Sequence, residues 1–264
     1  MPQSPYIREA GSGTSVVCLH CNASSSSQWR GLMDALSPSH HVIAPDLYGA
    51  GASPAWPMDR AMRLDDDVGL IEPALQRAGS EFALVGHSYG AALALVTAVR
   101  QPQRVRALAL YEPTLFSLIE AVSPAPNDAD GIRNTVIQAS KAVEAGAPSE
   151  AARYFIDYWM GAGAWSKTPE QRRGPIEASM VNVKHWGAAL MNEPTPIEAF
   201  AKLDIPVLLM TGTESPASSL GVARLLVNAL PQVQAVEFEG LGHMGPVTHP
   251  GVVNEAIVRF LQRH

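Results

Sequence analysis

The residues best suited to chemistry in this chain are a serine between glycines, a late histidine and a few carboxylates. Residues 86–90 read Gly-His-Ser-Tyr-Gly, the pattern G-x-S-x-G. An apolar run at 82–85 precedes them and a helix-like run at 91–100 follows. The two glycines allow a tight, strained turn with no Cβ in the way. The sequence therefore predicts a strand, a sharp turn and a helix, with Ser88 presented at the turn.

Ser88 needs a partner, because a serine hydroxyl is a poor nucleophile at neutral pH without a positioned base. His243 lies in a Gly-flanked loop after the last predicted strand and is the expected base. Such a pair performs acyl transfer through a covalent intermediate. Of the other histidines, we expect His20 to brace the loop that follows its strand, His87 to pack in the interior and His249 to begin the last helix.

Short apolar runs alternate with helical patterns, which predicts a parallel sheet with right-handed crossovers. The expected strands are nearly continuous Val/Leu/Ala runs, as in a sheet covered on both faces, at 16–19, 42–44, 82–85, 105–110, 207–211 and 235–238. The expected helices are 28–36, 60–77 with an interruption at Pro73, 91–100, 221–230 and 252–262.

The alternation stops between about residue 113 and residue 201, where no strand is expected. Helical patterns fill this stretch, which carries three of the five tryptophans, Trp159, Trp165 and Trp186. An all-helical insertion between two strands predicts a lid over the carboxyl edge of the sheet. Most of its aromatic side chains are expected to pack the lid, with one or two facing Ser88 to form an apolar pocket.

Composition narrows the class of protein further. The 264 residues are 47% hydrophobic, which favours a globular over a disordered protein, and their net charge of −6 argues against nucleic acid as a partner. The first residues show no signal-peptide pattern, and no apolar stretch is long enough for a membrane span. We therefore expect a cytoplasmic protein without a membrane partner, either a monomer or a homodimer.

The two cysteines, Cys18 and Cys21, are spaced C-x-x-C. A redox pair would need a helix N-terminus in a thioredoxin-like context. A zinc site would need two further ligands, and only His20 is near. The third interpretation, which we favour, places Cys18 in a buried strand and Cys21 in the loop after it.

In order along the chain, four motifs resemble those of the α/β-hydrolase superfamily, and in particular its cap-bearing, esterase-like serine hydrolases. They lie at residues 19–22, 46–53, 86–90 and 241–244. The resemblance runs nearly end to end. It implies an α/β-hydrolase fold, a mostly parallel doubly wound sheet with a helical cap. The core would comprise residues 1–112 and 202–264, and the cap residues 113–201.

The resemblance also implies roles for single residues. Ser88 would be the nucleophile and His243 the base, and a serine at this position makes dehalogenation by an enzyme carboxylate unexpected. Many relatives place the acid after the strand that follows the cap, where this chain has Ser215. Some branches place it before the cap, where this chain has Glu112, our expected acid. Glu214, one residue out of register, is the rival.

An oxyanion hole of two backbone amides completes the implied site. The amide of Tyr89, just after the nucleophile, and the amide of Asn22, in the loop after the early strand, are the expected donors. Cys21 stands where the superfamily usually has glycine. No cofactor and no metal are expected.

Together these features predict a serine hydrolase that cleaves small to medium apolar esters through a Ser-His-Glu triad and an acyl-enzyme, most simply a carboxylesterase. The same triad serves carbon–carbon bond hydrolases, lactonases and amidases, which remain alternatives. A non-catalytic protein that binds small molecules in the capped pocket is the alternative of another class.

Overall fold

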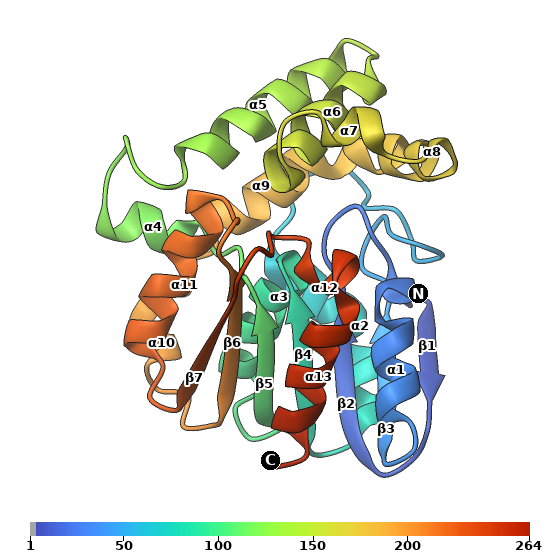
Figure 1. Cartoon of the computed structure of the whole chain (residues 1–264), viewed down its shortest axis with the longest axis vertical. Helices are drawn as coiled ribbons and strands as arrows, with labels where there is room; N and C mark the ends of the chain where they lie inside the picture. Colours follow the sequence, from blue (N-terminus) through green and yellow to red (C-terminus); the bar gives the residue numbers. More distant parts are fainter. Residues whose placement is uncertain (1–3) are drawn as a thin grey trace.

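The fold is built on one seven-stranded sheet. In the computed structural model, which describes residues 4–264, the strand order is β1-β3-β2-β4-β5-β6-β7 (Figure 1). The strands are β1 Ile7–Ala10, β2 Thr14–Leu19, β3 His40–Pro45, β4 Phe82–His87, β5 Val105–Tyr111, β6 Val207–Gly212 and β7 Val233–Phe238. All pairs are parallel except β1 with β3. The predicted α/β-hydrolase fold class is confirmed. The predicted core begins at residue 1, and its residues 1–3 lie outside the described residues.

The six predicted strands all form. The runs in β2, β3, β4, β5 and β6 are buried on both faces of the sheet, whereas β7 at the edge is half-buried or exposed. Strand β1 was not predicted. Two of its four residues are charged, and its side chains are half-buried or exposed, so it carries no buried-strand signal. It adds an antiparallel edge to β3, so that β3 and β2 lie between it and β4 (Figure 1).

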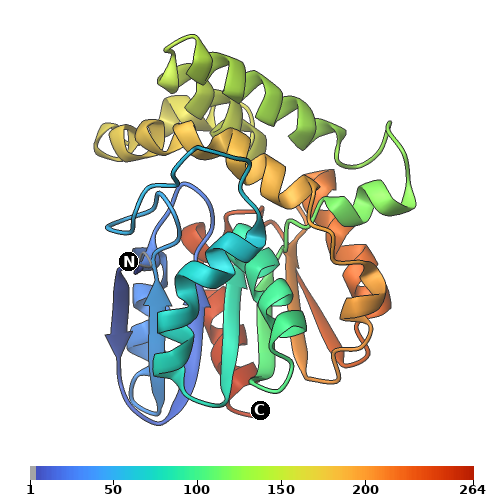
Figure 2. The same ribbon diagram turned by 180° about the vertical axis from the view of Figure 1, so that it is seen from behind.

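Helices cover both faces of the sheet. Figure 1 shows α1 (Arg30–Leu36) and α13 (Pro250–Leu261) on one face, and Figure 2 shows α2 (Leu64–Ala78) and α3 (Tyr89–Arg100) on the other. Two buried apolar clusters fill the spaces between these layers. Among the helices of residues 4–264, none combines the length and apolar character that a bilayer crossing requires.

Helix α2 differs from its prediction at both ends and in its middle. It begins at Leu64 rather than residue 60, because the Asp66 carboxylate accepts the Arg63 amide and caps the helix there. It also continues through Pro73, where we expected an interruption. The buried apolar face formed by Leu70, Ile71, Ala74 and Leu75 holds the helix against the sheet on both sides of the proline.

Between β5 and β6 the chain is entirely helical, as predicted. These helices lie above the carboxyl ends of the strands (Figures 1 and 2). They are α4 Ser117–Val122, α5 Asp130–Glu144, α6 Pro148–Met160, α7 Ala164–Lys167, α8 Glu170–Ser179, the 3-10 turn η2 Met180–Asn182, and α9 Val183–Met191. The last helix before β6, α10 (Ile197–Phe200), instead contacts α3 and α11 (Ala217–Ala229) beside the sheet. The division into a core and a cap at 113–201 remains a proposal.

Candidate active site

Ser88 lies at the turn between β4 and α3, where the backbone is strained. Its φ of +57° and ψ of −117° are rare for a residue with a side chain. The flanking glycines make the turn possible. A Cβ on Gly86 would come within 2.5 Å of the Ala91 Cα, and one on Gly90 within 2.2 Å of the Leu19 carbonyl oxygen. The turn therefore requires both glycines and presents Ser88 above the sheet.

Three of the predicted residues converge on one hydrogen-bonded line. Ser88 Oγ lies 2.8 Å from His243 Nε2, and His243 Nδ1 lies 2.6 Å from Glu112 Oε2. Because a carboxylate only accepts, Nδ1 carries the proton and Nε2 is free to accept from Ser88. All three side chains are buried, with Ser88 6%, Glu112 0% and His243 1% exposed. The arrangement can activate a serine and hold the resulting imidazolium.

Glu112 follows β5 directly and has the left-handed φ of +46°. Its Oε1 accepts from the Gly212 amide at 2.8 Å and from the Ser215 hydroxyl at 2.5 Å. Burial by itself would raise the pKa of Glu112, but the hydrogen bonds from His243, Ser215 and Gly212 outweigh it and lower the pKa. The rival acid Glu214 is exposed and makes no contact with His243.

The two predicted oxyanion donors stand at the ends of two different elements. Tyr89 is the first residue of α3, and Asn22 lies in the loop after β2, just before Ala23 with its φ of +54°. Within residues 4–264, neither amide has a hydrogen-bond acceptor. Free amides at a helix N-terminus attract negative charge. The Cys21 amide, just before Asn22, donates to Gln28 Oε1 at 3.2 Å.

His87 does more than pack. Its Nε2 donates to the backbone carbonyl of His243 at 2.8 Å, and its Nδ1 accepts from Gln28 Nε2 at 3.1 Å. Burial, and then the neighbouring His243, hold the pKa of His87 well below its ordinary value, so it is neutral. Gln28, through His87, thus connects the Cys21 loop with the His243 loop. No pattern in the sequence pointed to Gln28.

A tryptophan from the helices above the sheet covers the proposed base. The ring of Trp159, on α6, stacks on the His243 ring with 3.9 Å between centroids and 25° between planes. The neighbouring Tyr158 hydroxyl hydrogen-bonds the Ser218 hydroxyl on α11 at 2.7 Å. The end of α6 therefore contacts both the His243 loop and α11.

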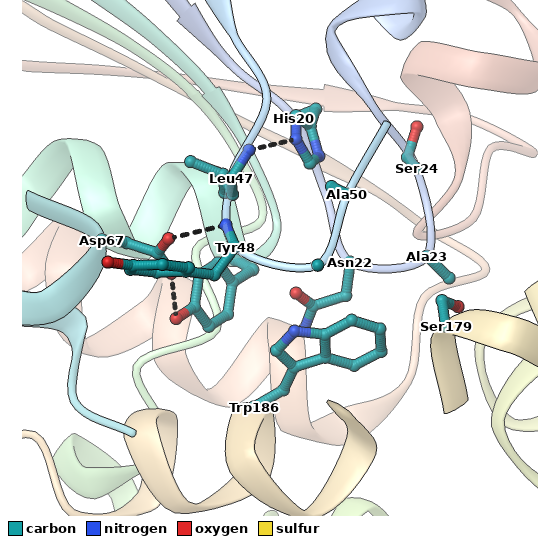
Figure 3. A pocket seen from close by; sticks show the side chains of 12 residues that line it. His20, Asn22, Ala23, Ser24, Leu47, Tyr48, Ala50, Asp67, Ser179 and Trp186 are labelled. Carbon is teal, nitrogen blue, oxygen red and sulfur yellow. Dashed lines mark hydrogen bonds between the residues drawn. The ribbon is translucent and has the colours of Figure 1, made fainter. Parts of the chain in front are cut away.

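A small cavity of about 10 Å³ lies beside the proposed oxyanion donors. This volume admits about one water molecule. Figure 3 shows the Asn22 side chain pointing toward the Trp186 indole of α9, with Tyr48, Asp67 and His20 around the same space. Asp67 is 1% exposed, so this wall of the cavity holds a buried carboxyl group.

Both cysteines are free and buried, Cys18 in β2 and Cys21 in the loop that follows. Burial raises the pKa of Cys21 to about 12 and that of Cys18 further, so both thiols stay protonated. In the part of the chain that the structure describes, no group of three or more potential metal ligands comes together. These contacts agree with the interpretation of the cysteines that we favoured.

Comparison with known proteins places this geometry in context. The family model described as alpha/beta hydrolase fold matches residues 14–250. A haloalkane dehalogenase of Bradyrhizobium diazoefficiens is 40% identical over 112 residues, which cover 41% of this chain and 36% of that protein. The match thus spans little more than a third of that relative.

Two further proteins are similar over nearly their whole length. The (E)-2-((N-methylformamido)methylene)succinate hydrolase of Acinetobacter baylyi is 23% identical, over 98% of this chain and 95% of that protein. The solved structure of a thermophilic esterase from Thermogutta terrifontis has a TM-score of 0.74 and 22% identity, over 98% of this chain and 93% of that one. At this identity the structural match shows a shared fold.

Proposed function

The chain belongs to the α/β-hydrolase family, and from that premise we propose that it is a serine hydrolase of small to medium, apolar, uncharged carboxylic esters. The observation that carries the proposal is the unbroken hydrogen-bonded line from Ser88 through His243 to Glu112. A hydroxyl, a neutral imidazole and a buried carboxylate in this order are the parts that acyl transfer requires.

In the proposed reaction Ser88 Oγ attacks the ester carbonyl while His243 Nε2 takes its proton. Glu112 holds Nδ1–H and stabilises the imidazolium that forms. The amides of Asn22 and Tyr89 receive the oxyanion of the tetrahedral intermediate, each worth about 3–4 kcal/mol in the transition state. His243 then gives its proton to the leaving alkoxide, and the acyl group stays on Ser88. In the second half His243 takes a proton from water, which attacks the acyl carbonyl, and then returns that proton to Ser88 Oγ as the acid leaves.

The surroundings of the triad support an apolar, uncharged substrate. Indole rings lie against His243 and beside Asn22, contributed by Trp159 and Trp186. Among the described residues that line the cavity, none is a lysine or an arginine. A substrate carboxylate beside the proposed oxyanion donors, such as the name of the Acinetobacter relative implies for that enzyme, would have no cationic partner among these lining residues.

A substrate panel tests the proposal. The purified protein would be assayed with aryl esters from acetate to octanoate, a γ-lactone, an anilide, a vinylogous 1,5-diketone and a succinate monoester. Ser88→Ala is the control for background hydrolysis. We expect Ser88-dependent turnover of the neutral esters, and weaker turnover of the charged monoester. Turnover confined to the diketone, lactone or anilide would replace the ester assignment, and no turnover of any compound would contradict the hydrolase proposal.

A further inference from the structure

Asp67 is a buried carboxyl group that the proposed reaction does not use. It lies in the first turn of α2 and makes no ion pair with any residue of 4–264. Its Oδ1 accepts the Tyr48 amide at 3.1 Å, and its Oδ2 accepts the Tyr89 hydroxyl at 2.8 Å. A carboxyl group without a counterion is costly to bury. The reason for burying Asp67 therefore lies with the two groups that donate hydrogen bonds to it.

The Tyr89 hydroxyl, one of the two donors, leads directly to the oxyanion hole. Tyr89 supplies one of the two proposed oxyanion amides and is the first residue of α3. Its ring is 1% exposed, and its hydroxyl bond to Asp67 fixes the far end of the side chain against α2. Asp67 thereby ties the start of α3, which carries the amide, to the neighbouring helix.

The Tyr48 amide, the other donor, leads to the Asn22 amide by a chain of hydrogen bonds. Next to Tyr48, the Leu47 amide donates to His20 Nε2 at 3.0 Å. His20 Nδ1 then donates to the Cys21 carbonyl at 2.7 Å. That carbonyl and the Asn22 N–H belong to one planar peptide group, so fixing the oxygen fixes the direction of the N–H. Figure 3 shows the bonds from Tyr48 to Asp67 and from Leu47 to His20.

The chain of bonds is consistent in its donors and acceptors. Since His20 Nδ1 faces a carbonyl and its Nε2 faces an amide, only the neutral ring with the proton on Nδ1 satisfies both. Burial lowers the pKa of His20 and favours this neutral form. Asp67 accepts one hydrogen bond on each oxygen and likewise satisfies Tyr48 and Tyr89 together.

We propose that Asp67 is a positioning residue of the oxyanion hole, holding the Asn22 peptide through Tyr48, Leu47 and His20 and the Tyr89 peptide through its hydroxyl. The inference rests on the proposed function, because an oxyanion hole has a purpose only if acyl transfer occurs. Preorganised donors stabilise a transition state because they need not reorient when charge develops. A loosened pair would reduce turnover more than substrate binding.

The test compares Asp67→Asn with Asp65→Asn, which removes the same charge from the same helix but at a surface ion pair with Arg63 and Arg100. Asparagine offers one acceptor oxygen where two donors point. With the fastest ester of the panel, we expect kcat of Asp67→Asn to fall about ten- to hundredfold with KM within about twofold. Asp65→Asn should retain wild-type kcat. Tyr89→Phe keeps the amide but loses the hydroxyl, and its effect should be less than additive with that of Asp67→Asn.

A second readout does not depend on turnover. The ¹H–¹⁵N resonance of the Asn22 amide should shift in Asp67→Asn and stay in place in Asp65→Asn, with both variants folded as judged by thermal unfolding. Wild-type turnover combined with an unchanged kcat in Asp67→Asn would overturn this inference and leave the proposed function standing. If the wild type cleaves nothing, the proposed function fails, and an unmoved Asn22 resonance would then overturn the positioning role as well.

Discussion

Ser215 donates its hydroxyl hydrogen bond to Glu112 at 2.5 Å, although the two residues follow different strands. The strands β5 and β6 are neighbours, so their carboxyl ends bring the two side chains to one place. The serine at the position where many relatives carry the acid therefore supports an acid that lies one strand away. Glu112 has the two neighbours it needs, His243 on one oxygen and Ser215 on the other.

Replacing the acid should nearly abolish turnover. In Glu112→Gln the amide can no longer stabilise the imidazolium and can present a donor to Nδ1, which favours the wrong tautomer of His243. We expect kcat to fall about 10³- to 10⁴-fold, measured by steady-state hydrolysis of an aryl ester. Glu214→Gln is the matched control and should keep wild-type activity. The opposite pattern would move the acid to the later strand.

Removing the Ser215 hydroxyl should have a smaller effect. Ser215→Ala deletes one of the hydrogen bonds that favour the charged carboxylate, while the Gly212 amide remains. Because hydrogen bonds to charged groups contribute about 1.5–3 kcal/mol, we expect kcat to fall about tenfold. Ser219→Ala, a buried serine of α11 that bonds the Pro216 carbonyl, serves as control. Equal activity of both variants would show that the contact with Glu112 contributes nothing.

The Trp159 ring should limit the size of the acyl group. It covers one face of His243, so Trp159→Ala opens space directly above the proposed base. We expect the ratio of kcat/KM for octanoate over acetate aryl esters to rise at least about tenfold, since accommodating even one more methylene contributes about 1–3 kcal/mol. Trp165→Phe changes another buried tryptophan of the same helical layer and should leave the ratio unchanged. A ratio that stays constant in Trp159→Ala would contradict this role.

The stability of the protein should carry a signature of Asp67. Burial raises the pKa of its carboxyl group to about 7, against the lowering effect of the bonds from Tyr48 and Tyr89. Since the folded-state pKa exceeds the unfolded value of about 4, the neutral form stabilises the fold at low pH, and this stability is lost as the pH rises through 7. Between about pH 5 and pH 8 we expect the unfolding free energy of the wild type, relative to Asp67→Asn, to fall by about 3 kcal/mol. Urea denaturation of both proteins at both pH values measures this change. A wild-type unfolding free energy that rises with pH relative to that of Asp67→Asn would contradict the raised pKa of Asp67.

The sequence predicted those parts of the fold and site that local patterns determine. The buried strands appeared as apolar runs, Ser88 stood between two glycines that its turn requires, and His243 stood in a Gly-flanked loop. Glu112 was expected as the acid from the resemblance to branches that place it before the cap, and the structure brings Glu112 to His243. Strand β1 was missed because its half-buried edge position imposes no apolar pattern.

The contacts that depend on distant parts of the chain could not be predicted. Gln28 and His87 are 59 residues apart, and Trp159 meets His243 only because α6 folds over the sheet. Asp67 appeared as one of three consecutive aspartates at the start of a helix, and only helix packing distinguishes it from its two neighbours. Tertiary packing, which no local spacing records, determines all three.

The central claim is that Ser88 is a nucleophile activated by His243, and covalent labelling tests it most directly. The protein would be incubated with a fluorophosphonate, and the adduct located by intact-mass and peptide mass spectrometry. We expect one phosphonyl group per chain on Ser88, none in Ser88→Ala, and labelling slowed by several orders of magnitude in His243→Ala. A wild-type protein that remains unlabelled, or an adduct on any residue other than Ser88, would contradict the account.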